Sequence, residues 1–344
     1  MLASIIIVSY NGKEELRDCL ASVVKTAPAD CEIIVVDNAS TDGSPAMVAQ
    51  SFPTVRLIRH TTNAGFGGAN NLAAREATGE FLVFLNPDTV VGPGWIEPLL
   101  EALRKEERAG LATGKLLRPD NRINTCGNRV HFTGLTLCRG LGSERNTFTE
   151  SEEVDAVSGA LFAMRRQLFE TIGGFDETMF LYMEDTDLSW RTRLAGWRCI
   201  YTPASVVVHN YELRFSSLKV YYQERNRYLM LLKTLRVATL AVLFPSLLLA
   251  DVVTWGFVLL RDRCHWRNKL RAYGWILQHR KLVREKRRHA QSLRNIRDHE
   301  LLAQTVHELE FAQVSTNFSG RFAAATFNPV FRLLRALTLA VVRW

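Results

Sequence analysis

The sequence predicts an α/β fold with a mostly parallel central sheet and helices on both of its faces. Between residues 3 and 85, short apolar runs alternate with helix-like stretches, which is typical of such sheets. Asn and Asp residues directly follow several of these runs, where parallel sheets bind their ligands. Hydrophobic residues make up 47% and charged residues 23% of the 344 positions, which excludes a disordered chain.

The strands and helices follow from hydrophobic spacing. Four mainly apolar runs predict buried strands, and apolar residues on one face of the stretch from Lys13 predict a helix. The strand runs cover 3–8, 33–36, 55–58 and 81–85. Beyond residue 110 the pattern loosens, and we expect this part to complete the sheet and supply the substrate side of the cleft. The expected strands there are 111–117, 129–138, 154–165 and 198–208, with short helices at 166–172 and 186–195.

Charge divides the chain unevenly. Residues 1–220 hold 22 Lys and Arg against 27 Asp and Glu, whereas residues 221–344 hold 21 against 8. A basic C-terminal third favours an anionic partner, either lipid headgroups or nucleic acid. No zinc-finger or RNA-binding motif accompanies it, so we expect no nucleic-acid partner. The six cysteines lack zinc-ligand spacing, which favours reduced thiols in a cytoplasmic protein.

Residues 237–260 form a 24-residue apolar segment with Asp251 as its one charged residue and Pro245 as its one proline. A helix of that length reaches about 36 Å, enough to cross a bilayer core. A central Asp opposes insertion, and Pro245 should kink or split the helix. Three interpretations stay open: helices packed on a globular domain, a membrane-dipping hairpin, and a transmembrane span.

The segment 261–297, which carries 13 Lys and Arg against Asp262 and Glu285, follows directly. Tryptophans in or beside this stretch suit the headgroup region of a bilayer, as does the apolar, arginine-containing segment 329–342. We therefore expect the region 236–344 to be helical and to associate with an anionic membrane surface.

Polar side chains at the predicted strand ends form the candidate site. Asp37 ends the second strand, and its carboxylate can accept hydrogen bonds from a ribose hydroxyl or a base N–H. The small residues from Asn63 to Gly68 let backbone N–H groups approach a phosphate or a sugar. Asp88 follows Asn86 and Pro87 after the strongest strand, where it can bind a hard divalent cation. Each of these residues also suits an ordinary turn or helix cap.

The acidic run Glu184-Asp185-Thr186-Asp187 is the second part of the candidate site. Carboxylates crowded in a cleft raise one another's pKa, which suits a general base. The alternative is an acidic helix N-terminus, with Asp187 capping it or pairing with Arg191. His209 ends the apolar strand 206–208, either as a structural residue or as a further ligand of the cation at Asp88.

Six motifs, in this order, resemble those of the family 2 glycosyltransferases, which have the GT-A fold. The resemblance covers about residues 3–235 and is strongest for the rhamnosyltransferase-like branch, which builds bacterial surface polysaccharides. The motifs are Val8-Ser9-Tyr10-Asn11, Val36-Asp37-Asn38-Ala39-Ser40-Thr41-Asp42-Gly43, Asn63-x-Gly65-Phe66-Gly67-Gly68-x-Asn70, Leu85-Asn86-Pro87-Asp88, Gly173-Gly174-Phe175-Asp176 and Glu184-Asp185-x-Asp187-Leu188-x-x-Arg191.

This resemblance implies roles for the matching residues. The nucleotide of a nucleotide-diphosphate sugar would be bound by Ser9, Tyr10, Asn11 and Asp37, in a pocket lined by Asn63 and Gly65. Asn86 and Asp88 stand where the family has its metal-binding D-x-D motif. Because Asn86 replaces the first acid, the affinity for Mg²⁺ or Mn²⁺ would depend more on the bound diphosphate. Asp185, with Glu184 beside it, matches the catalytic base, and His209 would assist the metal.

The implied reaction is an inverting transfer of one sugar at a time, since the Q-x-x-R-W signature of processive synthases is absent. The expected donor is dTDP-rhamnose or another nucleotide sugar, and the expected acceptor is a glycan or a lipid-linked glycan. We place the catalytic domain at 1–235 and expect a peripheral position on the inner face of the cytoplasmic membrane. The alternative function is a nucleotide-sugar-binding scaffold without turnover.

Overall fold

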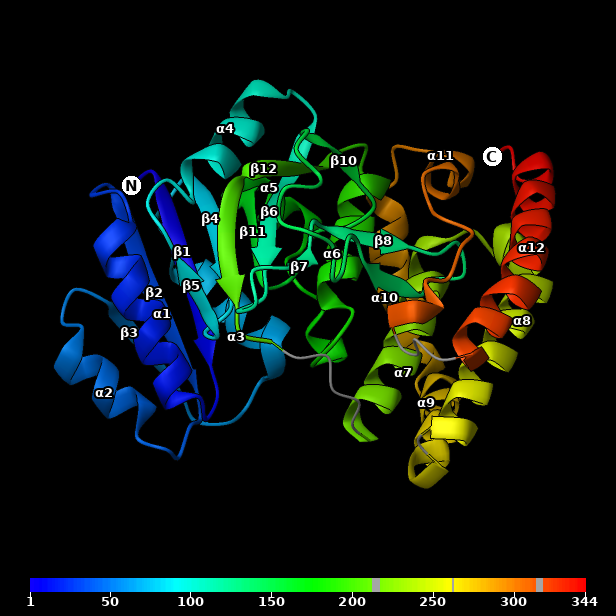
Figure 1. Cartoon of the computed structure of the whole chain (residues 1–344), viewed down its shortest axis with the longest axis horizontal. Helices are drawn as coiled ribbons and strands as arrows, with labels where there is room; N and C mark the ends of the chain where they lie inside the picture. The colour runs from blue at the N-terminus through cyan, green and yellow to red at the C-terminus, as the bar shows by residue number, and fades with distance from the viewer. Residues whose placement is uncertain (212–216, 262, 314–317) are drawn as a thin grey trace. The chain divides into compact units, whose positions relative to one another are not determined.

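The chain is described here by a computed structural model, which covers residues 1–211, 217–261, 263–313 and 318–344 (Figure 1). It divides into two compact units. Unit 1 comprises Met1–Asn128, Cys138–Thr192 and Trp197–Leu213, and unit 2 comprises Arg129–Leu137, Arg193–Gly196 and Arg214–Trp344. The catalytic-domain boundary expected at residue 235 stays a prediction, since these units reflect contacts and not activity.

A ten-stranded mixed sheet forms the centre of unit 1. Its main path runs β10-β12-β6-β11-β4-β1-β2-β3, while β5 pairs with β12 and β7 with β6. The strands are β1 (Ala3–Ser9), β2 (Cys31–Asn38), β3 (Arg56–His60), β4 (Phe81–Leu85), β5 (Thr89–Val91), β6 (Ala109–Leu117), β7 (Ile123–Thr125), β10 (Glu152–Val154), β11 (Leu161–Arg165) and β12 (Arg198–His209). The predicted α/β class with a mostly parallel sheet is confirmed.

The strand register brings several loop starts to one edge of the sheet. Strands β4, β1, β2 and β3 are parallel neighbours, with Ser9 opposite Asp37 and Ile7 opposite Leu85. Strand β11 runs antiparallel to β4, with Leu161 opposite Leu85. The carboxyl ends of the parallel strands and the amino end of β11 therefore lie at the same edge.

Helices cover both faces of this sheet. One face packs Ile5 and Ile7 of β1 against buried residues of α1 (Lys13–Thr26), α2 (Ser44–Ser51) and α4 (Glu97–Lys105). The other carries α3 (Gly65–Glu76), α5 (Arg166–Ile172) and α6 (Glu184–Leu194). Phe84 stacks on Phe162 there, and Phe175 approaches both rings edge-on. Burial of these apolar side chains on two faces explains why the strands read as continuous apolar runs.

Two expected strands are each divided in the structure. Residues 129–138 form β8 (Asn128–Val130) and β9 (Thr136–Cys138), because a turn closed by the Gly134 N–H to His131 reverses the chain. Gly134 adopts a φ of 85°, which glycine tolerates. Residues 154–165 form β10 and β11, separated by a turn in which Leu161 N donates to Ser158 O. Single uninterrupted strands were the wrong prediction at both places.

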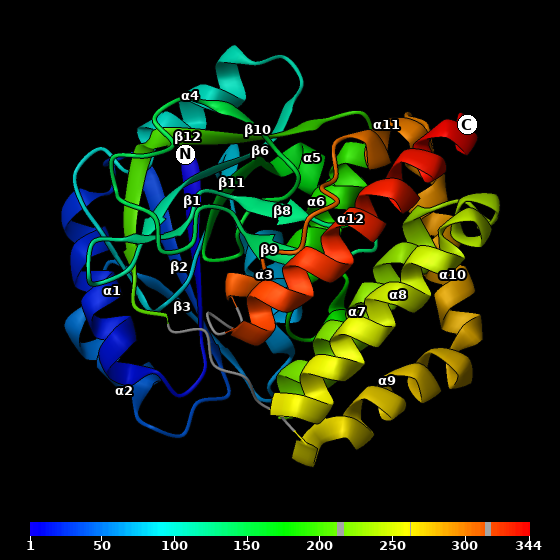
Figure 2. The same cartoon turned by 45° about the vertical axis from the view of Figure 1, so that its right-hand side comes forward.

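Unit 2 is mainly helical (Figure 2). Figure 2 shows α12, α8 and α9 lying side by side, and α7 packs against α9 and α10. Its helices are α7 (Ser217–Thr234), α8 (Val237–Arg261), α9 (Trp266–Gln278), α10 (Arg280–Ser292), α11 (Asp298–Ala303) and α12 (Phe318–Val341), with the 3-10 turns η2 (Arg263–His265) and η3 (Phe311–Gln313). A further 3-10 turn, η1 (Glu177–Met179), belongs to unit 1.

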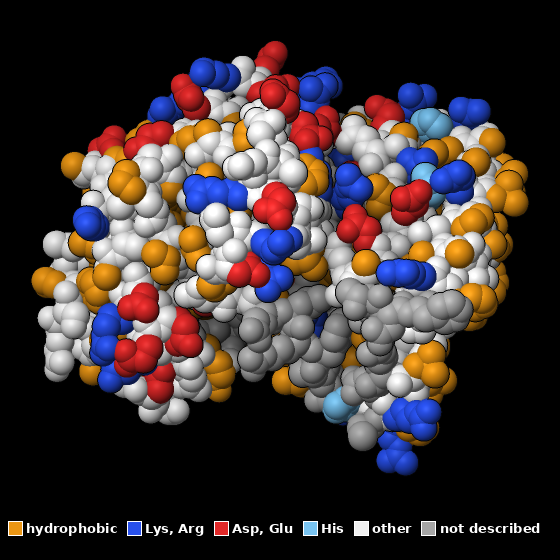
Figure 3. Space-filling model, in the orientation of Figure 1, with side chains coloured by type: hydrophobic (Ala, Val, Ile, Leu, Met, Phe, Trp, Pro, Cys, Tyr) orange, Lys and Arg blue, Asp and Glu red, His pale blue; other side chains and the backbone are white. Residues whose placement is uncertain are grey.

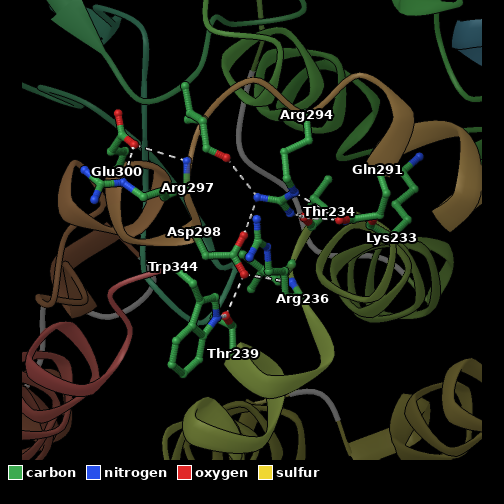
Figure 4. A network of polar contacts seen from close by, with 12 residues as sticks. Lys233, Thr234, Arg236, Thr239, Gln291, Arg294, Arg297, Asp298, Glu300 and Trp344 are labelled. Carbon is green, nitrogen blue, oxygen red and sulfur yellow. Dashed lines mark hydrogen bonds and ion pairs between the residues drawn. The ribbon is translucent and has the colours of Figure 1, made fainter.

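The junction between α7 and α8 is held by a polar network (Figure 4). Buried Asp298 accepts from the Arg236 backbone N–H at 2.8 Å and from the Thr239 hydroxyl at 2.6 Å, which caps the start of α8. Arg294 pairs with the same carboxylate at 2.6 Å and also donates to the Thr234 carbonyl. Gln291 donates to the Lys233 and Thr234 carbonyls, so the last carbonyls of α7 are satisfied as well.

The apolar segment 237–260 is one continuous helix, α8, and Pro245 does not split it. It is long and apolar enough to cross a membrane, and 28% of its most apolar window is buried. Asp251 has polar partners within unit 2. Arg227 of α7 lies 2.6 Å from one carboxylate oxygen, and the Tyr228 hydroxyl donates to the other at 2.7 Å. The central charge is thus neutralised inside unit 2.

Candidate active site

The loops that follow β1 and β2 hold each other in place. Thr41 N donates to the Asn11 side-chain oxygen at 2.8 Å, and Asn11 N donates to the Ser40 hydroxyl at 3.0 Å. Asn11 has a φ of 53°, a left-handed conformation that Asn tolerates better than most residues. Beside this joint, Asp37 is 5% exposed and faces Ser9 across the sheet register.

Ser9 and Tyr10, where the β1 and β2 loops meet, differ in exposure. The Ser9 hydroxyl oxygen is buried and has no hydrogen-bond partner among the described residues. Tyr10, the next residue, is 54% exposed. Because a buried hydroxyl without a partner costs free energy, this end of β1 favours a polar ligand.

Asn63 and Gly65 shape the loop before α3. The Asn63 side-chain oxygen accepts from Gly65 N and from the Asn38 amide, both at 2.9 Å. Asn38 in turn accepts from Ala64 N at 2.9 Å. Sequence reasoning did not single out Asn38, although it lies beside Asp37 in the second motif. The two asparagines lock this loop to the end of β2.

Gly65 also allows a close approach by the loop before α6. Phe66 N donates to Phe180 O at 2.8 Å, and a Cβ on Gly65 would lie 2.3 Å from that carbonyl oxygen. Gly65 has a φ of 73°, so a side chain there is excluded by conformation and by space. The third motif is therefore tied to the segment that leads into the acidic run.

Asp88 and His209 meet where β5 pairs with the end of β12. His209 Nε2 lies 3.3 Å from Asp88 Oδ1, and within the described chain neither atom makes a hydrogen bond. His209 Nδ1 contacts the Asn124 side-chain oxygen at 3.1 Å, which fixes the orientation of the ring. Tyr211 stacks on the imidazole at a centroid distance of 5.4 Å.

The acidic run is anchored beside the end of β4. Asp185 Oδ2 accepts from Gly159 N at 2.8 Å, and the next residue, Ala160, accepts from Asn86 N at 3.0 Å. Asp185 Oδ1 accepts from Thr186 N at 2.6 Å. Two backbone N–H groups therefore orient the carboxylate at the edge to which Asn86 belongs.

The three acids of the run have different environments. Asp187 pairs with Arg191 at 2.8 Å, and Arg191 also donates to the Ile172 and Gly174 carbonyls, so the pairing considered from the sequence is confirmed. Glu184 is 7% exposed, and its Oε2 has no partner among the residues described. Burial and the neighbouring charges of Asp185 and Asp187 raise the pKa of Glu184. Burial also raises the pKa of Asp185, against the opposing hydrogen bonds.

Two tyrosines connect the Asp88 pair with the acidic run. Burial and then the charges of Cys138 and Asp88 raise the pKa of Tyr211. Burial, followed by Tyr211 and Glu184, raises the pKa of Tyr182. The charge of Asp88 thus acts on Tyr211, and that of Glu184 acts on Tyr182. Sequence reasoning missed both tyrosines, although Tyr182 adjoins the acidic run and Tyr211 lies two residues beyond His209.

The residues at Asp88 suit a divalent cation that a diphosphate helps to hold. Carboxylate oxygen and imidazole nitrogen are both metal ligands, and each has an atom here without another partner. In the described parts of the chain, no three His, Cys, Asp or Glu side chains are grouped to hold a metal alone. A cation held by only these two protein ligands would therefore need further oxygen ligands from the substrate.

Comparison with known proteins identifies the family of the chain. The sequence model of glycosyl transferase family 2 matches residues 4–173. The N-acetylglucosaminyl-diphospho-decaprenol L-rhamnosyltransferase of Mycobacterium tuberculosis is 32% identical over 231 residues, covering 60% of this chain and 75% of the relative. The O-antigen biosynthesis protein RfbC of Myxococcus xanthus is 30% identical, covering 60% of this chain and 17% of that protein.

Solved structures show the same fold at lower identity. TarS 1–349 from S. aureus, in complex with UDP-GlcNAc, superposes with a TM-score of 0.58 at 17% identity, covering 99% of this chain and 89% of that one. GalNAc-T7 with UDP, GalNAc and Mn²⁺ gives a TM-score of 0.57 at 21% identity, covering 69% and 48%. Both neighbours have the GT-A fold, as the six motifs imply for about residues 3–235. The chain belongs to glycosyl transferase family 2 and is a glycosyltransferase with a GT-A fold and a helical C-terminal region.

Proposed function

We propose that this enzyme transfers a single sugar, with inversion, from a nucleotide-diphosphate sugar to a hydroxyl of a glycan or lipid-linked glycan. The observation that carries the proposal is the Asp185 carboxylate, held by Gly159 N beside the Ala160–Asn86 hydrogen bond. That carboxylate shares the sheet edge with the β1 and β2 loops. The rhamnosyltransferase and O-antigen names of the relatives support a role in cell-surface polysaccharide synthesis and rhamnose as the sugar.

In this proposal the joint between the first two loops binds the nucleotide. Ser9, whose hydroxyl has no partner among the described residues, and Asp37 offer hydrogen bonds to the nucleoside. The exposed ring of Tyr10 can stack on the base. Asn11 forms the joint itself through Ser40 and Thr41. Asn63 and Gly65 act through loop shape, since the Asn63 oxygen is already occupied by two donors.

Asp88 and His209 would hold Mg²⁺ or Mn²⁺ together with the donor diphosphate, next to Asn86. A cation bound there supplies positive charge for the departing nucleoside diphosphate. The Asn124 contact keeps His209 Nε2 directed at the Asp88 carboxylate, so the two ligands are positioned before the donor binds.

Asp185 is the general base of the proposed reaction. It accepts the proton of the acceptor hydroxyl while that oxygen forms a bond to the anomeric carbon, and the bond from this carbon to the diphosphate breaks. Gly159 N and Thr186 N each occupy one carboxylate oxygen, which fixes the direction of proton transfer. Glu184 lies beside the base in a buried position, where its raised pKa keeps the charge of the cluster low.

A screen of nucleotide sugars tests this function. The full chain is incubated with each donor, with and without Mn²⁺, and thermal unfolding and sugar transfer to membrane-extracted lipid-linked glycans are measured. We expect one class of nucleotide sugar to raise the melting temperature and to yield a product of inverted anomeric configuration, and dTDP-rhamnose is the first candidate. Asp88→Asn should reduce the Mn²⁺-dependent part of the stabilisation, whereas Asp120→Asn, at an exposed turn, should not. Retained configuration would contradict the mechanism, and donor binding without transfer would favour a non-catalytic scaffold.

A further inference from the structure

Over residues 237–260, helix α8 turns a fully apolar stripe toward solvent. Between residues 237 and 260, every exposed residue is apolar. Its large members recur at helical spacing and so form one stripe: Val237, Phe244, Leu248, Val252 and Leu259. The opposite stripe is buried in unit 2, with Leu243 and Ala250 completely covered. A helix in water normally turns charged side chains outward, so this stripe lacks its partner.

Helix α12 extends the same kind of surface beside α8. The two helices are in contact and lie side by side in Figures 1 and 2. Leu333 and Leu337 are 60% and 54% exposed, with Phe322, Val330 and Val341 exposed on the same stripe. Figure 3 shows hydrophobic side chains gathered over α12. We call the exposed stripes of α8 and α12 the apolar face.

Helix α9, which contacts α8, and α10, which contacts α9, carry positive charge almost exclusively. On α9 and α10 the exposed cations are Arg267, Arg271, Arg280, Lys281, Arg284 and Arg288, and the exposed acid is Glu285. Helix α12 contains no Asp or Glu. A second copy of this chain would bring the same cations close together and be repelled, whereas an anionic lipid surface would attract them.

The internal contacts of α8 oppose a transmembrane orientation. Asp251 is paired with Arg227, which also pairs with Glu224 at 2.7 Å. A spanning α8 would carry this charged cluster into the hydrocarbon or leave Asp251 without its partner, and either change is costly. A helix that lies in the membrane plane keeps the cluster on the protein side.

We propose that the apolar face docks unit 2 on an anionic bilayer, with α8 and α12 lying in the interface plane and neither crossing it. The apolar stripes enter the boundary between headgroups and acyl chains, and the cations of α9 and α10 contact the anionic headgroups. Trp266, which is partly exposed on α9, has the amphipathic ring that favours this depth. This inference does not depend on the chemistry of unit 1.

Flotation of the full chain with liposomes tests the docking. Wild type should float with vesicles of phosphatidylcholine and phosphatidylglycerol, less with phosphatidylcholine alone, and less again at high ionic strength. The double variant Leu248→Gln/Leu337→Gln should partition at least about tenfold more weakly, a change of about 1.4 kcal/mol. Val24→Gln, an exposed apolar position on α1, is the matched control and should float like wild type.

Extraction of the same vesicles at alkaline pH tests the orientation. A protein lying in the interface is released, whereas resistance to extraction would show a span and overturn the proposal. Equal flotation of the double variant and wild type would also overturn it, as would a stable dimer that the double variant converts to monomer. Circular dichroism and donor hydrolysis in solution should be unchanged in the double variant. These readouts separate a failed docking surface from misfolding and from a failed assignment of the active site.

Discussion

The two units bury carboxylates in opposite ways. In unit 1, Glu184 and Asp185 lie together, and no cation of the described residues forms an ion pair with either carboxylate. Burial raises the pKa of each. In unit 2, Glu224 contacts Arg227 at 2.7 Å and Lys269 at 2.9 Å, and these cations outweigh burial and lower the pKa of Glu224.

This difference separates a reactive carboxylate from a structural one. A buried acid whose charge is matched by cations stays ionised and stabilises the fold only while its partners are present. A buried acid without a cationic partner keeps a raised proton affinity, because burial outweighs the backbone N–H hydrogen bonds that oppose it, and a general base requires such an affinity. Within the same four residues, Asp187 has a cationic partner, Arg191, at 2.8 Å.

The largest expected effect on stability follows from removing a central cation of unit 2. Arg227→Met leaves Glu224 and Asp251 without their shared partner, and we expect the free energy of unfolding to fall by about 3–5 kcal/mol. Urea denaturation followed by circular dichroism measures this loss. Arg267→Met, an exposed arginine of α9, is the control. A loss no greater than that of the control would contradict the structural role of the cluster.

A smaller loss is expected at the junction of α7 and α8. Asp298→Ala removes the acceptor of the Arg236 N–H and the Thr239 hydroxyl and leaves Arg294 unpaired (Figure 4). Unsatisfied buried donors cost about 1–3 kcal/mol, and thermal unfolding should show a loss of that size. Glu308→Ala, at an exposed carboxylate, should leave stability nearly unchanged. Equal stability of both variants would show that Asp298 does not hold the junction.

The smallest effect concerns Glu184 and has the opposite sign. The pKa of Glu184 is higher in the folded than in the unfolded protein, so the protonated carboxyl favours the folded state. This contribution to stability is complete below the unfolded pKa near 4.5, and it is lost as the pH rises through the folded pKa. Glu184→Gln should therefore match wild type in acid and exceed it by about 1 kcal/mol near neutral pH. Unfolding titrations across this range measure the difference.

Glu224 provides the contrasting pH dependence. Its folded pKa is lowered, so its stabilisation is present above the unfolded value and is lost as pH falls through the folded pKa. A Glu184→Gln variant that is less stable than wild type at neutral pH would contradict this account. It would show that the surroundings of Glu184 stabilise its carboxylate, as those of Glu224 do.

Local patterns predicted the sheet and the loops that carry the site. The runs at 3–8, 33–36 and 81–85 became β1, β2 and β4, because strands buried on both faces are apolar at every position. The positions of Asp37 and Asp88 followed from the shared edge of parallel strands. The roles of the candidate residues, including Asn63, Gly65 and Asn86, remain predictions.

What sequence reasoning missed depends on contacts between distant residues. The partner of Asp251 lies 24 residues earlier, at Arg227, and no periodicity within 237–260 indicates it. Pro245 lies inside the continuous helix α8, so the break that the sequence offered is absent, while the kink stays a prediction. Left-handed backbone at Phe180, Tyr182 and Met183, just before Glu184, is equally invisible in the pattern, since such residues rarely adopt it.

Donor turnover by Asp185→Asn, measured together with donor affinity, tests the central claim most directly. The amide keeps the shape of the side chain but cannot accept a proton, so we expect transfer to fall by about 10²–10⁴-fold while the dissociation constant of the donor stays unchanged. Glu170→Gln, an exposed carboxylate on α5, should transfer sugar like wild type. Wild-type turnover by Asp185→Asn at unchanged donor affinity would contradict the assignment of Asp185 as the base.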